Sequence, residues 1–381
     1  MTIRETGFHD SAAAAGASFV EYEGYWLPSG FSSVAEEYEA CRNRAVVMDL
    51  SPLRKFEVKG PGAAALLQAT VTRDLGALAD GQVVYTAMCN EDGAVVDDGT
   101  VFRLGPTAFR WIGYTDEDGD WLRTHATGLG IEVEITASTD ELHNLAVQGP
   151  ASREIVAPLL HPAPGAPPVD ALGWFRFTTG RLGTEDGPPV LVSRTGYSGE
   201  LGYEIFCHPD DGARVWASVW EAGRGHGLCG LGLDALDVVR IEAGLIFRGY
   251  EYNGDEDPFE AGIGFTVPRA KADDFVGKEA LARRRENPRA RLVGLTVTEP
   301  EALGGELPSG EVRAGESEVG VVTSACDSPF VGAPIALARV AVESAAPGNV
   351  LSVAATPEGA PAGATVSRIP FYDPEKSRPR S

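Results

Sequence analysis

The sequence predicts an α+β fold that ends in a separate β domain. Helix-like and strand-like patterns mix through the first 285 or so residues, whereas from Leu292 onward short strands and Gly/Pro-rich turns follow, which is typical of a small β-barrel or sandwich. The 381 residues, 43% of them hydrophobic, suffice for two or three domains with substantial cores at roughly 150 residues each. We therefore expect a mixed region over residues 1–285 and a β-barrel domain over residues 286–381, with the boundary at Arg283-Arg284-Arg285.

A helix is expected near the start of the mixed region. Ser33 and Glu36 have the spacing of a capping box, in which each side chain bonds the backbone N–H of the other residue. The apolar residues that follow predict a helix that includes Ala45-Val46-Val47 and runs towards Met48.

A strand, a short helix and a hairpin come next. Residues 54–58 alternate apolar and charged side chains as a strand does, and the apolar run Ala63–Thr70 predicts a helix. Residues 83–88 and 94–102 have the pattern of two strands joined through Asn90-Glu91-Asp92-Gly93, whose residue types suit a turn. Together these two strands predict a β-hairpin.

Two further helices are expected before the β domain. Val215, Trp216, Val219 and Trp220 share one helical face, and Leu233–Leu245 forms a second amphipathic pattern. Residues 225–230 match G-x-G-x-x-G, but they follow a helix, whereas a dinucleotide-binding loop follows a strand; we expect a helix end and a turn. The strands expected in the β domain are Leu292–Val297, Val319–Ser324, Ile335–Val342, Val350–Ala354 and Thr365–Ile369.

The charge balance excludes two classes of partner. Lys and Arg number 32 against 55 Asp and Glu, a formal net charge of −23. Such a chain repels phosphate backbones and anionic lipid, so neither nucleic acid nor a membrane surface is expected as a partner. The sequence opens without the apolar segment of a signal peptide and holds no run of eighteen apolar residues, so a cytoplasmic protein is expected.

No metal site is expected either. The cysteines lack a Cys-x-x-Cys pair and, like the six histidines, are scattered, so we expect buried, reduced thiols. The five are Cys41, Cys89, Cys207, Cys229 and Cys326. The absence of a G-x-S-x-G motif and of a P-loop removes the simplest hydrolase and nucleotide-hydrolase hypotheses.

Asp97-Asp98 is the first candidate for chemistry, because both acids lie inside the second hairpin strand rather than in its turn. Strand alternation sends the two side chains to opposite faces, and Asp98 shares a largely apolar row with Val96 and Phe102. We expect one of the pair to be enclosed, and an enclosed carboxylate requires a partner or a function. The local sequence leaves open a structural pair, an edge-strand solubility device and a ligand-facing acid.

The segment of residues 194–206 is the second candidate. Its three glycines within seven positions allow a sharp turn or a close backbone approach, and Tyr197 and Tyr203 could stack on a flat ring. Glu204 re-enters an apolar strand, where a carboxylate can bind two adjacent N–H donors of a guanidine-like or aminopyrimidine edge. A glycine-rich turn before an ordinary edge strand is the alternative interpretation.

These segments, together and in this order, resemble the glycine-cleavage T-protein (aminomethyltransferase) family and the related tetrahydrofolate-dependent demethylases. The resemblance covers nearly the whole chain and implies two interleaved α/β units and a C-terminal β-barrel around a central folate channel. The matching stretches are residues 24–28, 48–51, 90–98, 146–150, 195–204, 240–244, 258–262, 275–281, 322–324 and 336–340.

The resemblance also implies a set of folate-site residues. In the family, the second acid of the Asp-Asp pair lies near the reactive N5/N10 edge of tetrahydrofolate, which implies a catalytic role for Asp98. The glutamate that closes the glycine-rich motif holds the pterin amino edge, which implies this role for Glu204. Tyr85 and Tyr197 are implied to line the pocket, and the backbone near Ile112 is implied to meet the pterin.

The sequence departs from T-proteins at two of the implied pocket positions. Leu236 stands where T-proteins have a folate-site arginine, and Tyr114, which we expect to contact the folate, stands where they have an asparagine. Ala235-Leu236-Asp237 and the tail Pro370–Pro374 look more like the dimethylglycine-oxidising and demethylase branches. No stretch resembles a flavin-binding domain, so a stand-alone transferase is expected.

The expected reaction moves a methyl or methylene group from a small methylated donor to tetrahydrofolate. The lipoyl carriers that serve T-proteins are acidic, so a chain of charge −23 would repel one, whereas a small donor meets no such barrier. The alternatives are T-protein activity, folate binding without catalysis, and membership of an amine-oxidising complex with an oxidoreductase partner subunit. The anionic folate tail requires a local basic site, for which Arg368, Arg378 and Arg380 are candidates.

Overall fold

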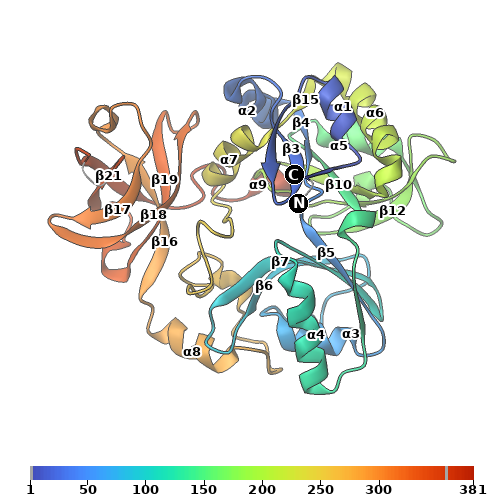
Figure 1. The fold of residues 1–381 in the computed structure, drawn as a ribbon, viewed down its shortest axis with the longest axis horizontal. Helices are drawn as coiled ribbons and strands as arrows, with labels where there is room; N and C mark the ends of the chain where they lie inside the picture. Colours follow the sequence, from blue (N-terminus) through green and yellow to red (C-terminus); the bar gives the residue numbers. More distant parts are fainter. Residues whose placement is uncertain (1–2, 357–358) are drawn as a thin grey trace.

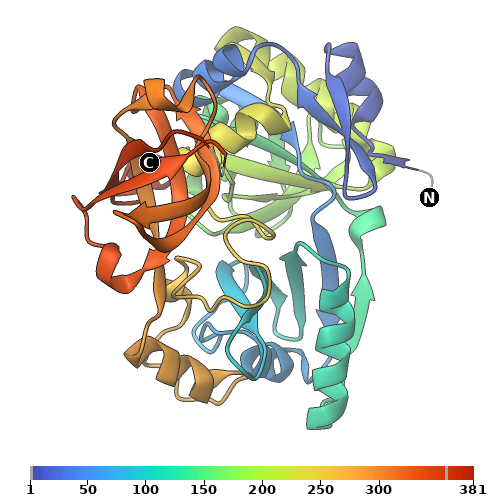
Figure 2. The same ribbon diagram turned by 60° about the vertical axis from the view of Figure 1, so that its left-hand side comes forward.

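Two large open sheets, one small three-stranded sheet and one closed barrel make up the described part of the protein. The computed structural model describes residues 3–356 and 359–381. Figure 1 shows a seven-stranded sheet with its helices at the upper right, a five-stranded sheet below it and the barrel at the left. Figure 2 shows the same three bodies from a second direction, with the barrel in front. The predicted α+β class with a C-terminal barrel is confirmed.

The five-stranded sheet contains the predicted hairpin. Its strand order is β6, β7, β8, β5, β9, and helices α3 and α4 pack on one face through a core that includes the fully buried Trp111. The expected strand at residues 54–58, the helix at residues 63–70 and the hairpin are all confirmed. The bounds are β5 Arg54–Lys59, α3 Ala63–Thr70, β6 Val83–Cys89, β7 Val95–Gly105, β8 Ala108–Gly113, α4 Glu117–Leu129 and β9 Glu134–Ala137.

The seven-stranded sheet is assembled from segments that lie on both sides of the five-stranded sheet in the sequence. Its order is β11, β12, β13, β14, β10, β4, β15, so β4 pairs with strands that come about one hundred or more residues later. The two sheets are therefore interleaved along the chain, as expected. The bounds are β4 Ala45–Asp49, β10 His143–Gln148, β11 Leu160–Pro162, β12 Phe177–Leu182, β13 Pro189–Ser193, β14 Gly202–Cys207 and β15 Leu228–Gly230.

Helices cover both faces of this sheet. On one face α1 (His9–Ala14), α5 (Ser152–Val156) and α6 (Gly212–Gly223) pack on the core, and on the other face lie α2 (Val34–Asn43) and α7 (Leu233–Glu242). The side chains of residues 45–48 in β4 alternate between these two cores, which explains why this stretch is apolar. Three short strands, β1 (Arg4–Glu5), β2 (Ser18–Tyr22) and β3 (Tyr25–Gly30), form a separate sheet beside it.

The prediction that the first long helix runs through Ala45-Val46-Val47 towards Met48 is wrong. The capping box of Ser33 and Glu36 is present, but the helix ends at Asn43 and residues 45–49 form β4. A short apolar run is compatible with a helix or with a strand buried on both faces, and here the pairing with β10 and β15 decides for the strand.

The glycine pattern of residues 225–230 forms a turn, as expected. Residues 224–226 make a single 3-10 turn after α6, Gly227 has a φ of 67°, and β15 begins at Leu228. A side chain at Gly227 would be strained by that left-handed conformation. No strand precedes the pattern, so its geometry differs from that of a dinucleotide-binding loop.

The C-terminal part forms a closed six-stranded barrel. The strands order as β16, β19, β18, β17, β20, β21, and all five predicted strands are present. β17 was not predicted, because its glycine, arginine and glutamate obscure the alternation. The bounds are β16 Ala290–Val297, β17 Ser309–Ala314, β18 Ser317–Ser328, β19 Ala333–Ala341, β20 Val350–Ala354 and β21 Ala362–Ser367.

A largely irregular segment and a helix connect the seven-stranded sheet to the barrel. Residues 243–277 follow α7 and lie between all three bodies in Figures 1 and 2, and α8 (Lys278–Glu286) comes before β16. The arginines at which we expected the domain boundary lie in the last turn of α8. The boundary itself, near residue 286, stays a prediction.

A buried ion-pair network holds the barrel against the sheet. Glu242, at the end of α7, is fully buried and accepts hydrogen bonds from Tyr38 of α2 and from Ser328 of β18, the latter at 2.6 Å. Nη2 of Arg42 lies 2.9 Å from Oε2 of the same carboxylate. One charged cluster thus joins residues of both domains, and it requires each partner because an unpaired buried charge is costly.

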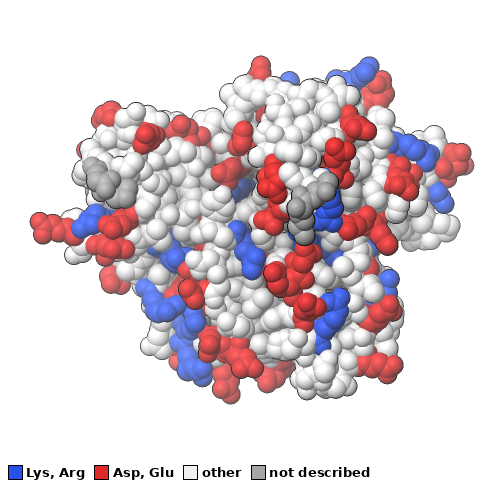
Figure 3. All heavy atoms as spheres, viewed as in Figure 1, with Lys and Arg blue, Asp and Glu red and all other residues white. Residues whose placement is uncertain are grey.

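Acidic side chains are spread over the visible surface in Figure 3, with lysines and arginines scattered among them. Cys229 retains exposed surface, whereas the other four cysteines are buried and all five are free thiols. In the part of the chain that the structure describes, no helix is long and apolar enough to cross a membrane. The same residues contain no group of three or more His, Cys, Asp or Glu side chains placed to hold a metal ion.

Candidate functional site

The acid pair of β7 is the centre of the candidate site. Asp97 is 0% exposed, so one acid of the pair is enclosed as expected, while Asp98 retains some accessible surface. The phenol of Tyr85, on the neighbouring strand β6, donates a hydrogen bond of 2.6 Å to Oδ2 of Asp98. The phenol of Tyr252, from the irregular segment after α7, lies 2.5 Å from Oδ1 of Asp98 and 3.0 Å from Oδ1 of Asp97.

Both carboxylates reach the same phenol because β7 lacks a strand neighbour on one side at this point. The pairing of β7 with β8 begins only at Thr100, so the backbone N–H of Asp98 is free and donates to the Tyr252 oxygen at 3.1 Å. Tyr252 therefore takes the place of a strand along this short edge. Alternation was expected to send the two acids to opposite faces of the strand. Their carboxylates nevertheless share one hydrogen-bond partner, the phenol of Tyr252.

The surroundings of Asp98 favour its protonated form more than water does. Burial and the charge of Asp97 raise the pKa of Asp98 to about 6, although the hydrogen bonds from Tyr252 and Tyr85 oppose the shift. Burial and the carboxylates raise the pKa of both phenols well above the ordinary value, so both keep the proton that they donate. Asp98 thus titrates close to neutral pH between two permanent donors.

A second carboxyl group supports Asp97 from behind. Asp118, in the first turn of α4, accepts a hydrogen bond of 2.7 Å from the indole of Trp111 and is hydrogen-bonded to Asp97. Burial, and then the charge of Asp97, raise the pKa of Asp118 to about 10, so Asp118 carries the shared proton at neutral pH. A side chain at Gly113 would lie 2.5 Å from Oδ2 of Asp118 and 2.6 Å from Oδ2 of Asp97, so this approach requires glycine.

Glu204 forms a second polar cluster on the seven-stranded sheet. Its carboxylate accepts hydrogen bonds from the hydroxyl of Thr195 and from Nδ2 of Asn144, the latter at 3.2 Å. Asn144 is fully buried, and its Oδ1 has no hydrogen-bond partner among the residues that the structure describes. Burial raises the pKa of Glu204, against the opposing effects of these two donors and of Lys55. The cluster therefore combines a carboxylate with an unused buried acceptor, an arrangement suited to a ligand with adjacent N–H donors.

Lys55 lies beneath this second cluster. It is fully buried, and its ammonium group donates to the carbonyl oxygens of Ser51 and Leu53 at 2.9 and 2.8 Å. Burial lowers the pKa of Lys55 to about 7, while the charges of Asp49 and Glu204 act in the opposite direction. Lys55 pairs with Ile112 across β5 and β8, so the Glu204 cluster adjoins the five-stranded sheet.

Tyr114 and Tyr197 lie on the side of the acid pair. The backbone N–H of Tyr114 donates to Oδ2 of Asp97 at 2.6 Å, while its phenol donates to Glu23 at 2.7 Å. The phenol of Tyr197 donates to the carbonyl of Ile246 at 2.5 Å, and the charge of Asp98 is one of the groups that raise its pKa. Tyr85 and Asp98 are thus in direct contact, whereas the phenols of Tyr114 and Tyr197 bond Glu23 and Ile246 instead.

Ile112 lies inside β8, between β5 and β7. Its backbone belongs to the sheet, and its side chain joins a buried apolar cluster with Phe206 from β14. Contact between the backbone of Ile112 and a ligand stays a prediction. Because that backbone pairs with β5 and β7 on both sides, the side chain is better placed than the backbone to contact a ligand.

The glycines before Glu204 have a structural role. A Cβ at Gly196 would lie 2.0 Å from the side-chain amide of Gln148, and one at Gly202 would lie 2.2 Å from it. The turn therefore closes directly over the buried Gln148, and the alternative interpretation of a structural glycine-rich turn applies to these two positions.

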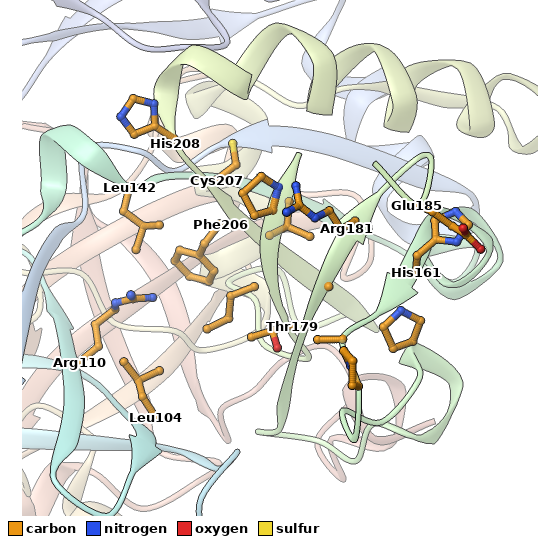
Figure 4. Close-up of a pocket in the computed structure, with 17 residues that line it drawn as sticks. Leu104, Arg110, Leu142, His161, Thr179, Arg181, Glu185, Phe206, Cys207 and His208 are labelled. Carbon is orange, nitrogen blue, oxygen red and sulfur yellow. The ribbon is translucent and has the colours of Figure 1, made fainter. Parts of the chain in front are cut away.

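A groove of about 920 Å³ is lined by residues of both large open sheets. Figure 4 shows Arg110 and Leu104 of the five-stranded sheet at one end, and His161 of β11 with Glu185 of the turn between β12 and β13 at the other. None of the six residues for which we expect a folate contact lines it. This groove is therefore separate from the acid pair.

Sequence reasoning missed three residues of the site. Tyr252 and Asp118 belong to segments without a motif and reach the acid pair only through the fold. Asn144 had a usable signal, since it is a polar residue inside the apolar strand β10 and such residues require a partner.

Comparison with known proteins gives consistent results for both parts of the chain. Residues 8–271 match the GCVT N-terminal domain, and residues 291–373 match the glycine cleavage T-protein C-terminal barrel domain. The aminomethyltransferase of Bacillus mycoides is 37% identical over 350 residues, which are 91% of this chain and 92% of that protein.

Two other similar proteins extend this comparison. The trimethylamine-oxide aldolase of Ruegeria pomeroyi is 50% identical over 99% of this chain, which spans about half (48%) of that relative. The crystal structure of the glycine cleavage system aminomethyltransferase T of Bartonella henselae superposes with a TM-score of 0.84 at 24% identity, covering 97% of this chain and 98% of that one. This last similarity concerns the fold.

Proposed function

The chain belongs to the glycine cleavage T-protein family, and on this premise we propose that it transfers a methyl or methylene group from a small methylated donor to tetrahydrofolate. Reduced folate supplies the nucleophilic nitrogen that receives the one-carbon unit. The contribution of the protein is to hold both reactants and to place charge beside the reacting atoms.

The arrangement of Asp98 carries this proposal. Its carboxylate lies between the phenols of Tyr85 and Tyr252, which fix its orientation, and its pKa of about 6 lets it hold or release a proton near neutral pH. In the ionised form it stabilises positive charge on a neighbouring nitrogen, and it can accept a proton from that nitrogen. Transfer of a one-carbon unit to an amine nitrogen requires both of these roles.

The Glu204 cluster fits the pterin ring of the acceptor. A pterin presents an amino group beside a ring N–H, and Glu204 with the unpartnered Oδ1 of Asn144 offers acceptors for such donors. Tyr85, Tyr114 and Tyr197 supply aromatic surface near the acid pair.

Two observations favour a small donor over a lipoyl carrier. Leu236, which is buried in α7, stands where T-proteins have the folate-site arginine, and the net charge of −23 repels an acidic carrier. The similarity to a trimethylamine-oxide aldolase adds a methylated amine oxide to the donors that deserve testing. We place the protein in the cytoplasm, where reduced folate and reduced thiols coexist, and an oxidoreductase partner subunit is an additional proposal.

A panel of donors tests the reaction. The purified chain is incubated with tetrahydrofolate and, in separate reactions, with methylated glycines, methylated amines, trimethylamine oxide and an aminomethyl-loaded lipoyl carrier, and product folates are identified by mass spectrometry. We expect 5-methyl-tetrahydrofolate from a methylated glycine or amine, whose demethylated amine leaves with a proton. From trimethylamine oxide we expect 5,10-methylene-tetrahydrofolate, because cleavage of its N–O bond supplies the oxidation and dimethylamine and water leave. Product with the lipoyl carrier alone would contradict the donor class, and tight binding without product from any donor would indicate a folate-binding protein.

The Asp98→Asn variant tests the role of the acid. It keeps the size of the side chain and removes the charge, so we expect kcat with the best donor to fall by about 10²–10³-fold. Full turnover in this variant would exclude Asp98 from catalysis. Asp92→Asn, in the exposed turn of the same hairpin, is the matched control.

Aminomethyl transfer in the glycine cleavage manner is the second candidate. The relative at 37% identity that is an aminomethyltransferase matches this chain over nearly the whole length of both proteins. The lipoyl-carrier reaction in the panel decides between the two, because only this candidate predicts product from the carrier.

A further inference from the structure

Arg248 lies next to the acid pair, on the side of Asp97. Its Nε is 4.0 Å from Oδ1 of Asp97, and the phenol of Tyr252 lies 3.0 Å from the same oxygen. That phenol also donates to Asp98, whose other oxygen accepts the hydrogen bond from Tyr85. The contacts therefore run from Tyr85 through Asp98, Tyr252 and Asp97 to Arg248, and Arg248 lies at the end of this series away from Tyr85.

The guanidinium group of Arg248 has unused hydrogen-bond donors. Its separation of 4.0 Å from Asp97 exceeds the length of a hydrogen bond, and within the described residues the group donates to no other side chain or carbonyl oxygen. Asp97 already accepts from the backbone N–H of Tyr114 and from Asp118. The side chain of Arg248 is 36% exposed, so a small ligand can reach it.

Two aromatic rings border Arg248. Its guanidinium carbon lies 5.8 Å from the centroid of the Tyr114 ring. The ring of Phe247 meets that of Tyr114 edge-on, with centroids 5.6 Å apart and an interplanar angle of 75°. Both side chains are only half-buried, so a ligand bound to Arg248 can also contact these rings. Methyl groups on a positively charged nitrogen are attracted to such rings.

The turn between β2 and β3 holds the Tyr114 ring in place. The phenol of Tyr114 donates to Glu23 at 2.7 Å and lies 3.4 Å from the phenol of Tyr22. Glu23 has a φ of 51°, a left-handed conformation that glutamate rarely adopts. Strain of this kind occurs where function requires a fixed geometry, and here it places a carboxylate against the phenol of Tyr114.

We infer that Arg248 determines donor specificity by binding an anionic oxygen that the donor carries near its methylated nitrogen. The positive nitrogen lies toward the carboxylates of Asp97 and Asp98, and its methyl groups contact Tyr114 and Phe247. A cation beside two carboxylates is complementary to such a zwitterion. The inference rests on the proposed function, since it names the chemistry of the donor that the same site takes.

Two kinds of donor carry this anionic oxygen. In an N-methylated amino acid it belongs to a carboxylate, and in a methylated amine oxide it is bonded to the nitrogen itself. A simple methylated amine is a cation without such an oxygen, so Arg248 repels it. The two zwitterions therefore share the contact with Arg248, and each has a matched amine that lacks it.

The test compares these matched pairs. Affinities for N,N-dimethylglycine and N,N-dimethylethylamine, and for trimethylamine oxide and trimethylamine, are measured by calorimetry with saturating tetrahydrofolate for the wild type, Arg248→Gln and Arg248→Lys. We expect Arg248→Gln to weaken binding of at least one zwitterion by about 10–100-fold and to leave both amines bound as in the wild type or more tightly. Arg248→Lys should restore part of the loss. The zwitterion that responds identifies the oxygen as a carboxylate or an oxide.

A charge-matched control separates direct contact from the general field of the protein. Arg269 is an exposed arginine of the same irregular segment, and Arg269→Gln removes the same charge. Equal losses in this control, equal losses for the amines, or zwitterion affinities in Arg248→Gln like those of the wild type would overturn the inference, as would a wild type that binds neither zwitterion.

Turnover distinguishes this failure from that of the proposed function. Product formation with an unchanged KM for both zwitterions in Arg248→Gln would overturn the role of Arg248 and leave the proposed function in place. Binding of a zwitterion that depends on Arg248, without product from any donor, would instead overturn the proposed function and support the binding site.

Discussion

The phenol oxygen of Tyr252 lies 2.5 Å from Oδ1 of Asp98, although 154 positions separate the two residues in the sequence. A phenol has one hydrogen, and Asp97 competes for it at 3.0 Å. Asp97 already receives the Tyr114 N–H at 2.6 Å and the proton of Asp118. The hydrogen of Tyr252 is therefore available to Asp98. In this way Asp97 and Asp118 help to orient the Asp98 carboxylate.

Removing this phenol should shift the pH dependence of the reaction. The hydrogen bond from Tyr252 lowers the pKa of Asp98, so in Tyr252→Phe that pKa rises above about 6. Since the carboxylate form is the active one, we expect the acidic limb of kcat/KM to move to higher pH by roughly half a unit to one unit. Tyr250→Phe, the same change at an exposed tyrosine of the same segment, should leave the limb in place. An acidic limb of kcat/KM at the same pH in Tyr252→Phe as in the wild type would contradict the assignment of this limb to Asp98.

The shared proton of Asp118 should appear as a pH-dependent stability. The folded protein keeps this proton up to a pKa of about 10, whereas in the unfolded chain the aspartic acid releases it near its ordinary pKa of 3.8, so the contribution of Asp118 to stability falls as pH rises through this window. Asp118→Asn does not titrate. We therefore expect the free energy of unfolding of Asp118→Asn, measured relative to that of the wild type in urea titrations, to increase by about 1–3 kcal/mol when the pH is raised from 4.5 to 8.

Asp120 provides the control for that measurement. It lies in the same helix with its side chain 87% exposed, so Asp120→Asn should keep a constant difference from the wild type at every pH. If the difference for Asp118→Asn were also constant, the two carboxyl groups would not share a proton.

Glu204→Gln should weaken folate binding without unfolding the protein. The amide keeps the volume of the side chain but turns one acceptor into a donor that faces the N–H groups of Asn144 and of the ligand. We expect the Kd for tetrahydrofolate to rise by about 10–100-fold in calorimetry, with an unchanged circular dichroism spectrum. Glu134→Gln on the exposed edge strand β9 is the matched control, and an unaltered Kd in Glu204→Gln would remove this residue from the site.

Glu242→Ala should loosen the barrel. The substitution leaves Arg42 buried without one of its carboxylates and removes the acceptor of Ser328, so we expect a loss of about 3–5 kcal/mol in the free energy of unfolding. Glu343→Ala, an exposed acid in the barrel, should change stability by less than about 0.5 kcal/mol. A Glu242→Ala variant as stable as the wild type would show that the apolar contacts hold the barrel without the network.

Local patterns in the sequence predicted those parts of the fold that depend on neighbouring residues. The hairpin of β6 and β7 and five of six barrel strands follow from alternation and turn chemistry. The strand at Ala45-Val46-Val47 was not predicted from local patterns. An apolar triplet becomes a strand or a helix according to the partners that pack on both faces, and those partners lie about one hundred or more residues away in the sequence.

The site shows the same division. Asp98 was found because a carboxylate inside a strand is unusual by itself, and the resemblance to a family then gave it a role. Tyr252 was not found, because a tyrosine in an irregular segment carries no signal until the open edge of β7 gives it a backbone N–H to meet.

The interleaving of the two sheets has a consequence for how the chain emerges from the ribosome. Residues 54–137 contain the whole five-stranded sheet and can complete it as soon as they are synthesised, whereas β4 must wait for β10 and then for β15 at residue 228 before its neighbours exist. The apolar β4 is thus exposed longest in the growing chain. A pause in translation between residues 137 and 228 would prolong the stage at which a nascent chain of this kind is most exposed to aggregation and most dependent on chaperones.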